Sequence, residues 1–260
     1  MLEVEFVEVS DVGKVRGHNE DYIGRVVPAT PAKSRSHGWL FALADGVGGQ
    51  DKGEVASRLA VETTLAEFTK SAPAEALSTL LPRAIQAANL RVYEAGHGSI
   101  ATTIVACALR YDRAVVAHVG DSRCYLIRRG HVQAITRDHS VVAEQVRLGV
   151  LSEEEAKESS KKNVLNRSLG IEMFVSADVG EHQLAPGDVL LLCSDGLHGP
   201  LRSPEIAKVL QQTPDLKEAA AKLVAIANER DGGDNVSIQL VRVREVERVG
   251  MYRGRPYRLR

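Results

Sequence analysis

The sequence has almost no net charge and little cysteine. Its 33 lysine and arginine residues nearly balance its 34 aspartate and glutamate residues, so the formal net charge is −1. A balanced chain creates no overall field that favours nucleic acid or an anionic membrane, and we expect neither as a partner. Cys107, Cys124 and Cys193 are scattered, which argues against a disulfide framework and a zinc cage. Small buried thiols in a reducing compartment are expected instead.

The sequence also lacks long hydrophobic runs. No uninterrupted apolar stretch approaches the ~20 residues that a membrane-spanning helix needs. Residues 1–5 are acidic and alternate between apolar and charged side chains, unlike a signal peptide. These absences predict a cytoplasmic protein. With 260 residues, 44% of them hydrophobic, the chain can build a substantial core as one large domain or two small ones.

The pattern of apolar residues predicts more strands than helices. Strands are expected at residues 3–10, 22–27, 39–44, 100–109, 114–119, 123–128, 131–135, 175–183, 189–193 and 235–240. Helices are expected at residues 54–70, 74–95, 141–148 and 203–211, with a short one opened by a capping box of Ser152 and Glu155, and a last one capped by Thr213 with Pro214 at its first position. Helices do not alternate with strands, so we expect antiparallel sheets with helices layered on them.

Three polar segments interrupt this pattern. Residues 28–38 contain two prolines and are expected to form an exposed loop. Residues 138–170 form a long excursion between two blocks of strands, and such excursions are often functional flaps. The Arg-rich tail, residues 244–260, has few apolar anchors. We expect it to be partly disordered or packed on the surface, and the sequence assigns it no function.

Acidic residues stand at the ends of several predicted strands. Asp45 directly follows the apolar run 39–44 and is itself followed by glycines, and Asp195 follows the run 189–193 in the same way. Asp234 directly precedes the last predicted strand. Together with acids in two loops, the candidate set is Glu20, Asp21, Asp45, Asp121, Asp195 and Asp234. Taken singly, each of these acids could serve as an ordinary turn or cap residue.

Clustered carboxylates repel one another, and each desolvated one is costly unless it is paired. The counter-charges are either Arg and Lys side chains or divalent cations. Oxygen-only ligands suit Mg²⁺ or Mn²⁺ and disfavour zinc, and the glycines after Asp45 and Asp195 let the backbone approach an ion. Two ions that share a carboxylate and a water would activate that water for displacement at phosphorus. Arg16, four residues before Glu20, could hold phosphate oxygens or form a surface ion pair.

Seven short motifs in order carry a family resemblance. They are Arg16-Gly17-His18-Asn19-Glu20-Asp21, Asp45-Gly46-Val47-Gly48-Gly49, Ala101-Thr102-Thr103, Gly120-Asp121-Ser122-Arg123, Asp138-His139-Ser140, Ser194-Asp195-Gly196-Leu197 and Gly233-Asp234-Asn235. Any one of them is common, but seven in register are highly specific. Over roughly residues 5–243 the chain closely resembles the metal-dependent protein serine/threonine phosphatases of the PP2C type, in their bacterial form.

The resemblance implies an α+β fold, a four-layer α-β-β-α sandwich of two antiparallel sheets flanked by helices. It implies one phosphatase domain over residues 1–243, with residues 138–170 as the flap beside the active site. It also implies two Mn²⁺ or Mg²⁺ ions and a weaker third one. By motif, Asp45 would bridge the two ions, the Gly46 carbonyl would bind one of them, Glu20 or Asp21, Asp195 and Asp234 would complete the pair, Asp121 would hold the third ion, and Arg16 would bind the substrate phosphate.

Two departures from the family pattern affect the chemistry. Gly199 stands where family members usually carry an acid that helps to hold the third ion, so we expect that ion site to be weak or differently built. His198 could substitute for the acid, although a solvated surface histidine is the preferred interpretation. Val47 stands where some relatives have a histidine proposed as general acid. His18 is then a candidate proton donor, with loop packing as the simpler role.

Three functions are compatible with these residues. The first is hydrolysis of phosphoserine and phosphothreonine in proteins by a water activated by two metals, with phosphoproteins and a cognate serine/threonine kinase pathway as partners and a monomer as the active form. The second is a catalytically weak or inactive relative that binds phosphoproteins as a scaffold. The third is a metal phosphatase for a small phosphate ester or a phosphoserine-containing regulator of transcription. For the smaller motifs, Arg123 is expected to tie strands together, Thr102 and Thr103 to bond within the sheet, and His139 to make a structural hydrogen bond.

Overall fold

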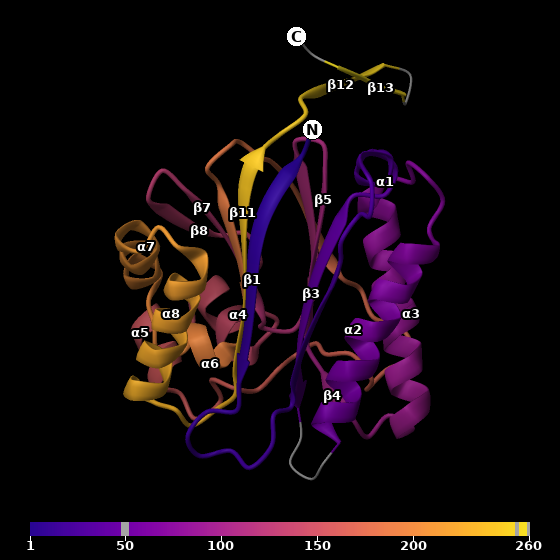
Figure 1. Ribbon diagram of the computed structural model, residues 1–260. Coiled ribbons are helices and arrows are strands. Elements are labelled where there is room, and N and C mark those ends of the chain that lie inside the picture. The colour runs from indigo at the N-terminus through magenta and orange to yellow at the C-terminus, as the bar shows by residue number, and fades with distance from the viewer. Residues whose placement is uncertain (48–51, 253–254, 259–260) are drawn as a thin grey trace.

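The computed structural model describes residues 1–47, 52–252 and 255–258, and it shows a sandwich of two sheets (Figure 1). The first sheet has the strand order β1 (Glu3–Asp11), β11 (Val236–Glu245), β10 (Val189–Cys193), β7 (Arg123–Arg128) and β8 (His131–Ala134). The second has the order β2 (Asp21–Val26), β3 (Trp39–Val47), β5 (Ile104–Arg110), β6 (Arg113–Val119) and β9 (Asp178–Gln183), with β4 (Ala101–Thr102) paired to β3. Each of these described strand pairs is antiparallel.

Helices cover both outer faces of the sandwich (Figure 1). The long helices α2 (Gly53–Lys70) and α3 (Leu77–Gly96) pack on the second sheet. On the first sheet lie α6 (Asp195–His198), α7 (Ser203–Gln212) and α8 (Leu216–Arg230). The predicted four-layer α-β-β-α sandwich is therefore confirmed. Among the described residues, no helix combines the length and the apolar character that crossing a membrane requires.

Strand β3 shows why the sequence folds into layers. Leu40, Ala42 and Ala44 belong to the core between the second sheet and its helices, whereas Phe41 and Leu43 belong to the core between the two sheets. Successive strand residues point to opposite faces, so a strand covered on both sides must be apolar at every position. The continuous apolar run that ends at Asp45 is the consequence. The three cysteines are free and buried, as predicted.

Several predicted element boundaries were wrong. The expected loop at residues 28–38 contains a short helix, α1 (Pro31–Ser36), which Thr30 caps by accepting a hydrogen bond from the Lys33 amide. Thr213 ends α7 and does not open the next helix, because the cap of α8 is Asp215, whose side chain accepts from the Glu218 amide. The turn α6, directly after β10, was not predicted at all.

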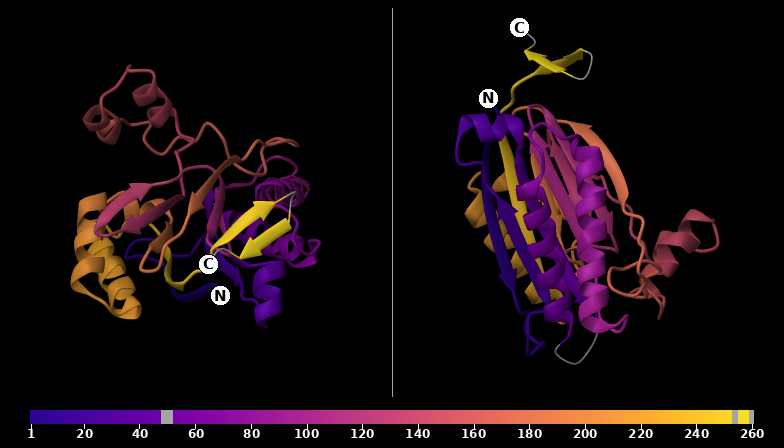
Figure 2. Two further views of the ribbon diagram at one scale, coloured as in Figure 1. Left: turned by 90° about the horizontal axis from the view of Figure 1, so that it is seen from above. Right: turned by 90° about the vertical axis from the view of Figure 1, so that its right-hand side faces the viewer.

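The flap, residues 138–170, stands out from one edge of the sandwich (Figure 2). It carries α4 (Val141–Arg147) and α5 (Glu153–Glu158), and the predicted capping box of Ser152 and Glu155 is present. Backbone hydrogen bonds tie its base to the sandwich. The His139 amide donates to the Gly120 carbonyl over 3.0 Å, and Leu169 and Thr102 exchange a pair of bonds.

The C-terminal tail forms a hairpin of β12 (Val249–Tyr252) and β13 (Arg255–Arg258), which the sequence did not predict. The hairpin lies beyond the end of the sandwich that is opposite the base of the flap (Figures 1 and 2). Strand β11 also runs on to Glu245, five residues beyond its predicted end at residue 240.

Candidate metal centre

Four of the predicted acids meet at one end of the sandwich. Asp21 opens β2 and lies directly opposite Asp45 in the antiparallel register of β2 and β3. The other two acids come from the first sheet, in which β10 and β11 are neighbours. Asp195 follows β10 as the first residue of α6, and Asp234 lies two residues before β11. The two sheets therefore deliver carboxylates from four distant segments to one place, as the strand-end pattern predicted.

The backbone around Asp45 is fixed by two threonines. The Asp45 amide donates to Thr103 Oγ1 over 2.9 Å, and the Asp45 carbonyl accepts from Thr102 Oγ1 over 2.8 Å and from the Thr103 amide over 2.9 Å. Thr102 and Thr103 thus bond within the sheet, as predicted. Next to Asp45, a Cβ built on Gly46 would lie 2.3 Å from the Gly53 carbonyl oxygen, so only glycine allows this close approach of β3 to the start of α2.

The buried carboxylates strongly perturb one another. Burial raises the pKa of Asp21 to about 7, and the negative charges of Asp195 and Asp234 add to the rise. Burial also holds the pKa of Asp45 well above its usual range, with Asp21 and Asp195 as the next causes. The pKa of Asp195 is raised to about 6 by burial and by Asp234. Such a cluster is stable in its charged form only with cations, and its all-oxygen donor set fits Mn²⁺ or Mg²⁺.

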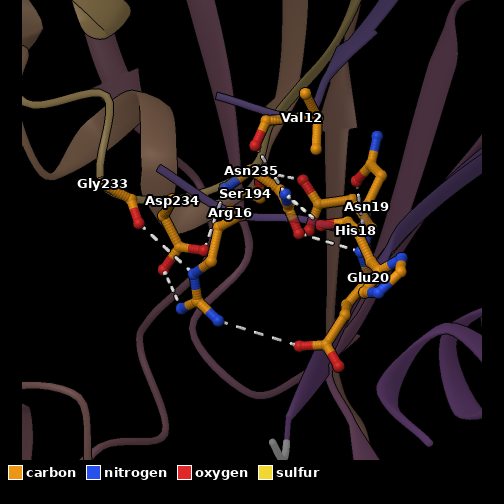
Figure 3. A network of polar contacts seen from close by, with 10 residues as sticks. Val12, Arg16, His18, Asn19, Glu20, Ser194, Gly233, Asp234 and Asn235 are labelled. Atoms are coloured by element: carbon orange, nitrogen blue, oxygen red, sulfur yellow. Dashed lines mark hydrogen bonds and ion pairs between the residues drawn. The ribbon is translucent and has the colours of Figure 1, made fainter. Parts of the chain in front are cut away.

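Arg16 lies beside two of the candidate acids, Asp234 and Glu20 (Figure 3). Its Nη2 lies 3.0 Å from Asp234 Oδ2, its Nε donates to the Gly233 carbonyl over 3.3 Å, and its Nη1 lies 3.9 Å from Glu20 Oε2. The side chain remains 45% exposed, whereas that of Glu20 is only 14% exposed. Arg16 therefore bridges two of the candidate acids and is still accessible from solvent.

Asp121 lies at the margin of the cluster. Its pKa is raised to about 7 by burial, by Asp195 and by Asp138. His198 Nε2 lies 3.0 Å from the backbone carbonyl oxygen of Asp121. The expectation that His198 is a solvated surface residue was wrong, because the side chain is partly buried and bonded to Asp121, and its pKa is lowered to about 4 by burial and by Arg123. Gly199, beside it, offers no side chain for a third ion.

Arg123 and His139 have the structural roles that the sequence predicted. Arg123 Nε and Nη2 form a two-pronged ion pair with Asp138, at 2.8 and 2.7 Å. Because Asp138 is the first residue of the flap, this pair fastens the flap to β7. His139 Nδ1 accepts from the Gly120 amide over 3.1 Å, and its Nε2 lies 3.3 Å from Asp178 Oδ2. None of these bonds directs Arg123 or His139 toward the candidate metal-binding acids.

Sequence reasoning missed two residues of the site. Ser194 and Asn235 were quoted only as parts of motifs, yet both are buried and both bond to the candidate acids or to the loop before them. Ser194 Oγ donates to Asp21 Oδ2 over 2.7 Å, and the Asn235 side chain reaches the loop at residues 12–20. A polar residue directly beside a strand-end acid was the available signal, but its partner could not be identified without the fold.

The four-layer sandwich is shared with solved bacterial phosphatases. The S. agalactiae serine/threonine phosphatase has a TM-score of 0.85 at 35% identity, and the match covers 93% of this chain and 100% of that one. The catalytic domain of the phosphatase PstP, solved in complex with two manganese ions, has a TM-score of 0.82 at 31% identity, covering 94% of this chain and 100% of that one.

The family itself is established by sequence. A model of the family described as Protein phosphatase 2C matches residues 17–241, so the chain belongs to the protein phosphatase 2C family, as the resemblance implied. The serine/threonine phosphatase Stp of Listeria innocua is 35% identical over 254 residues, which cover 95% of this chain and 96% of that protein. The protein phosphatase PhpP of Streptococcus pneumoniae is 31% identical over 248 residues, covering 93% and 98%.

Proposed function

We propose that the chain hydrolyses phosphoserine and phosphothreonine in proteins with the help of two divalent cations. The observation that carries this proposal is the set of closely spaced acids around Asp45, of which Asp21 is buried and the others are partly buried. Three of them, Asp21, Asp45 and Asp195, have raised pKa values because they lie close together away from water. Arg16 alone cannot balance such a cluster, since a single guanidinium carries one positive charge. The cluster is therefore suited to bind cations of higher charge.

The candidate ligands follow from the motifs and from their placement. Asp45, opposite Asp21 and hydrogen-bonded to Asp195, is the acid best placed to be shared between two ions. The Gly46 carbonyl, Glu20 or Asp21, Asp195 and Asp234 would complete the pair, and Asp121 would hold a weaker third ion. Mn²⁺ or Mg²⁺ in this place would supply the activation of a water for attack on phosphorus and the neutralisation of charge on the phosphate.

Arg16 is proposed to bind the substrate phosphate. Its planar guanidinium can hold two phosphate oxygens at once, and nearly half of its side chain is exposed. In the present structure it contacts Asp234 and Glu20. Carboxylates that hold cations would bind Arg16 less strongly, which would leave the guanidinium available to a phosphate.

A catalytically weak or inactive scaffold is the second candidate. Gly199 and Val47 favour it, because each lacks a side chain that family members use. The complete set of clustered acids opposes it, since a scaffold gains nothing from a cluster that needs cations. Calorimetric titration with Mn²⁺ separates the two: the absence of heat up to millimolar Mn²⁺ would favour the scaffold.

The experiment for catalysis is hydrolysis of a phosphothreonine peptide with Mn²⁺. We expect Asp45→Asn to abolish hydrolysis and a chelator to abolish that of the wild type reversibly, because both remove the shared ligand or its ions. Asp215→Asn is the matched control, since asparagine caps a helix as well as aspartate does and Asp215 caps α8. Hydrolysis that survives both Asp45→Asn and the chelator would refute the mechanism.

The wider setting is also part of the proposal. The substrates would be proteins phosphorylated by a cognate serine/threonine kinase, and the flap, which lies beside one edge of the sandwich, would influence which of them bind.

We further propose that the protein acts as a monomer in the cytoplasm. Phosphate release from a small ester and from the peptide, compared at equal concentration, tests whether proteins are the preferred substrates.

A further inference from the structure

The loop at residues 12–20 carries Arg16 and Glu20, yet it lies between β1 and β2 without regular structure of its own. The buried side chain of Asn235 binds this loop at several points (Figure 3). Asn235 is 4% exposed, and its Nδ2 donates to the carbonyls of Val12 and His18, each over 2.9 Å. Its Oδ1 accepts from the Glu20 amide over 2.8 Å. Both side-chain amide protons and the amide oxygen are thus used, and this side chain binds the loop at three points, in addition to the bond from the Lys14 amide to the Gly232 carbonyl over 2.9 Å and the bond from Asn19 Nδ2 to Ser10 Oγ over 2.8 Å.

The same residue also orients Asp234. The backbone N–H of Asn235 donates to Asp234 Oδ1 over 2.9 Å, and Arg16 Nη2 contacts the other oxygen of that carboxylate over 3.0 Å. The backbone of residue 235 thus holds Asp234, whereas the asparagine side chain holds the loop that carries Arg16. Its two bonds to Val12 and His18 lie on either side of Arg16 in the chain, so they restrict the part of the loop from which the guanidinium extends.

We propose that Asn235 is a positioning residue that holds Arg16 ready for the substrate phosphate. The inference rests on the proposed function, because it takes Arg16 as the phosphate-binding group. Asn235 would act on substrate affinity more than on metal affinity. Glu20 has a second attachment, the bond from the Gly46 amide to its carbonyl over 3.1 Å, and it stays in place when Asn235 is changed.

Ser194 gives the matched contrast from the metal side of the same site. It is fully buried, and its Oγ accepts from the Ser237 amide over 3.0 Å. Its proton is therefore directed to Asp21 Oδ2, 2.7 Å away. Although Ser194 precedes α6, its side chain makes no capping bond to that helix. Ser194→Ala should loosen Asp21 and weaken Mn²⁺ binding, without releasing the loop of Arg16.

The decisive variant is Asn235→Asp. It keeps the size of the side chain and an oxygen for the Glu20 amide, but it removes the two donors to Val12 and His18. We expect the KM for a phosphothreonine peptide to rise about tenfold while kcat changes less than about threefold, as for a lost charge-assisted phosphate contact. Amide hydrogen exchange of residues 13–18 should accelerate. The dissociation constant for Mn²⁺, measured by calorimetry, should stay within about threefold of the wild type.

A double-mutant cycle with Arg16→Ala separates positioning from the added charge. If Asn235 acts through Arg16, the KM penalty of Asn235→Asp should largely disappear in the Arg16→Ala background. Asn235→Ala, which adds no charge, should give the same coupling. Independent penalties in both cycles would overturn the inference, as would a loss of Mn²⁺ affinity equal to that of Ser194→Ala. A wild type that binds no Mn²⁺ or hydrolyses nothing would instead refute the proposed function.

Discussion

The buried acids should make the metal-free protein less stable as the pH rises, and Asp21 provides the clearest case. Its pKa is about 7 in the folded protein against 3.8 for the unperturbed group. Between these values the folded state holds a proton that the unfolded chain has lost, so the contribution of Asp21 to stability is complete below about pH 4 and is lost as the pH rises through about 7. Between pH 5 and pH 7 the free energy of unfolding should therefore fall by ~3 kcal/mol, because each of the two pH units costs ~1.4 kcal/mol.

The wild type must be compared with a variant, because buried histidines make the protein more stable as the pH rises and so oppose the effect of Asp21. The pKa of His198 is lowered to about 4 by burial and by Arg123, so its contribution to stability increases between about pH 4 and pH 6.5. Subtracting the wild type from Asp21→Asn removes this effect. In a chelating buffer, Asp21→Asn should therefore gain ~3 kcal/mol relative to the wild type between pH 5 and pH 8.

The assay is urea unfolding followed by circular dichroism, with both proteins freed of divalent ions. Saturating Mn²⁺ should reverse the result at pH 8, because bound cations stabilise the wild type and Asp21→Asn binds them less well. A stability difference that stays constant from pH 5 to pH 8 would show that Asp21 does not hold a proton in the folded state. The reasoning about the carboxylate cluster would then be wrong.

Two smaller predictions concern the periphery. Truncation after Glu247 removes the hairpin of β12 and β13 but keeps the ion pair between Arg35 and Glu247, so the melting temperature should change by less than about 2 °C and kcat/KM by less than about twofold, as calorimetry and the peptide assay will show. A large loss of melting temperature or of kcat/KM would show that the tail is part of the folded, active domain. Arg123→Lys should cost about 1–2 kcal/mol and speed proteolysis within the flap, because lysine cannot make the two-pronged pair with Asp138; unchanged proteolysis would contradict the anchoring role.

Much of the fold was predictable because the clearest apolar patterns in the sequence belong to the most deeply buried strands. The run before Asp45 is apolar at every position, since β3 is covered by helices on one face and by the other sheet on the opposite face. A run of this kind admits few alternatives. The same logic placed Asp195 and Asp234 at strand ends, and the geometry of a two-sheet sandwich then gathered these acids at one end.

The errors arose where local signals are nearly equal. Thr213 and Asp215 are both good helix caps two residues apart, and Pro214 between them suits either choice. The helix α8 begins after Asp215, whose side chain bonds to the Glu218 amide, and Thr213 ends α7. The helix α1 was missed because six residues with two serines give no periodic apolar pattern. Such choices are settled by tertiary packing, which a single sequence does not show.

The roles of Ser194 and Asn235 were out of reach for a different reason. The side chain of each bonds to a part of the site more than 170 positions away, Ser194 to Asp21 and Asn235 to the loop of Arg16. Local pattern cannot supply such partners. Ser194 even occupies the cap position of α6, where the local rule predicts a bond to the helix backbone, and its side chain makes none there.

The source of the proton for the leaving group can be narrowed by the bonds of the nearby histidines. Val47 has no proton to give. His198 is neutral above about pH 5, because its pKa is about 4, and its Nε2 faces the Asp121 carbonyl. His139 is held by the Gly120 amide at Nδ1 and by Asp178 at Nε2, and burial lowers its pKa as well. Both rings are thus neutral and occupied at physiological pH. Neither ring is therefore suited to protonate the departing serine or threonine oxygen in the proposed reaction.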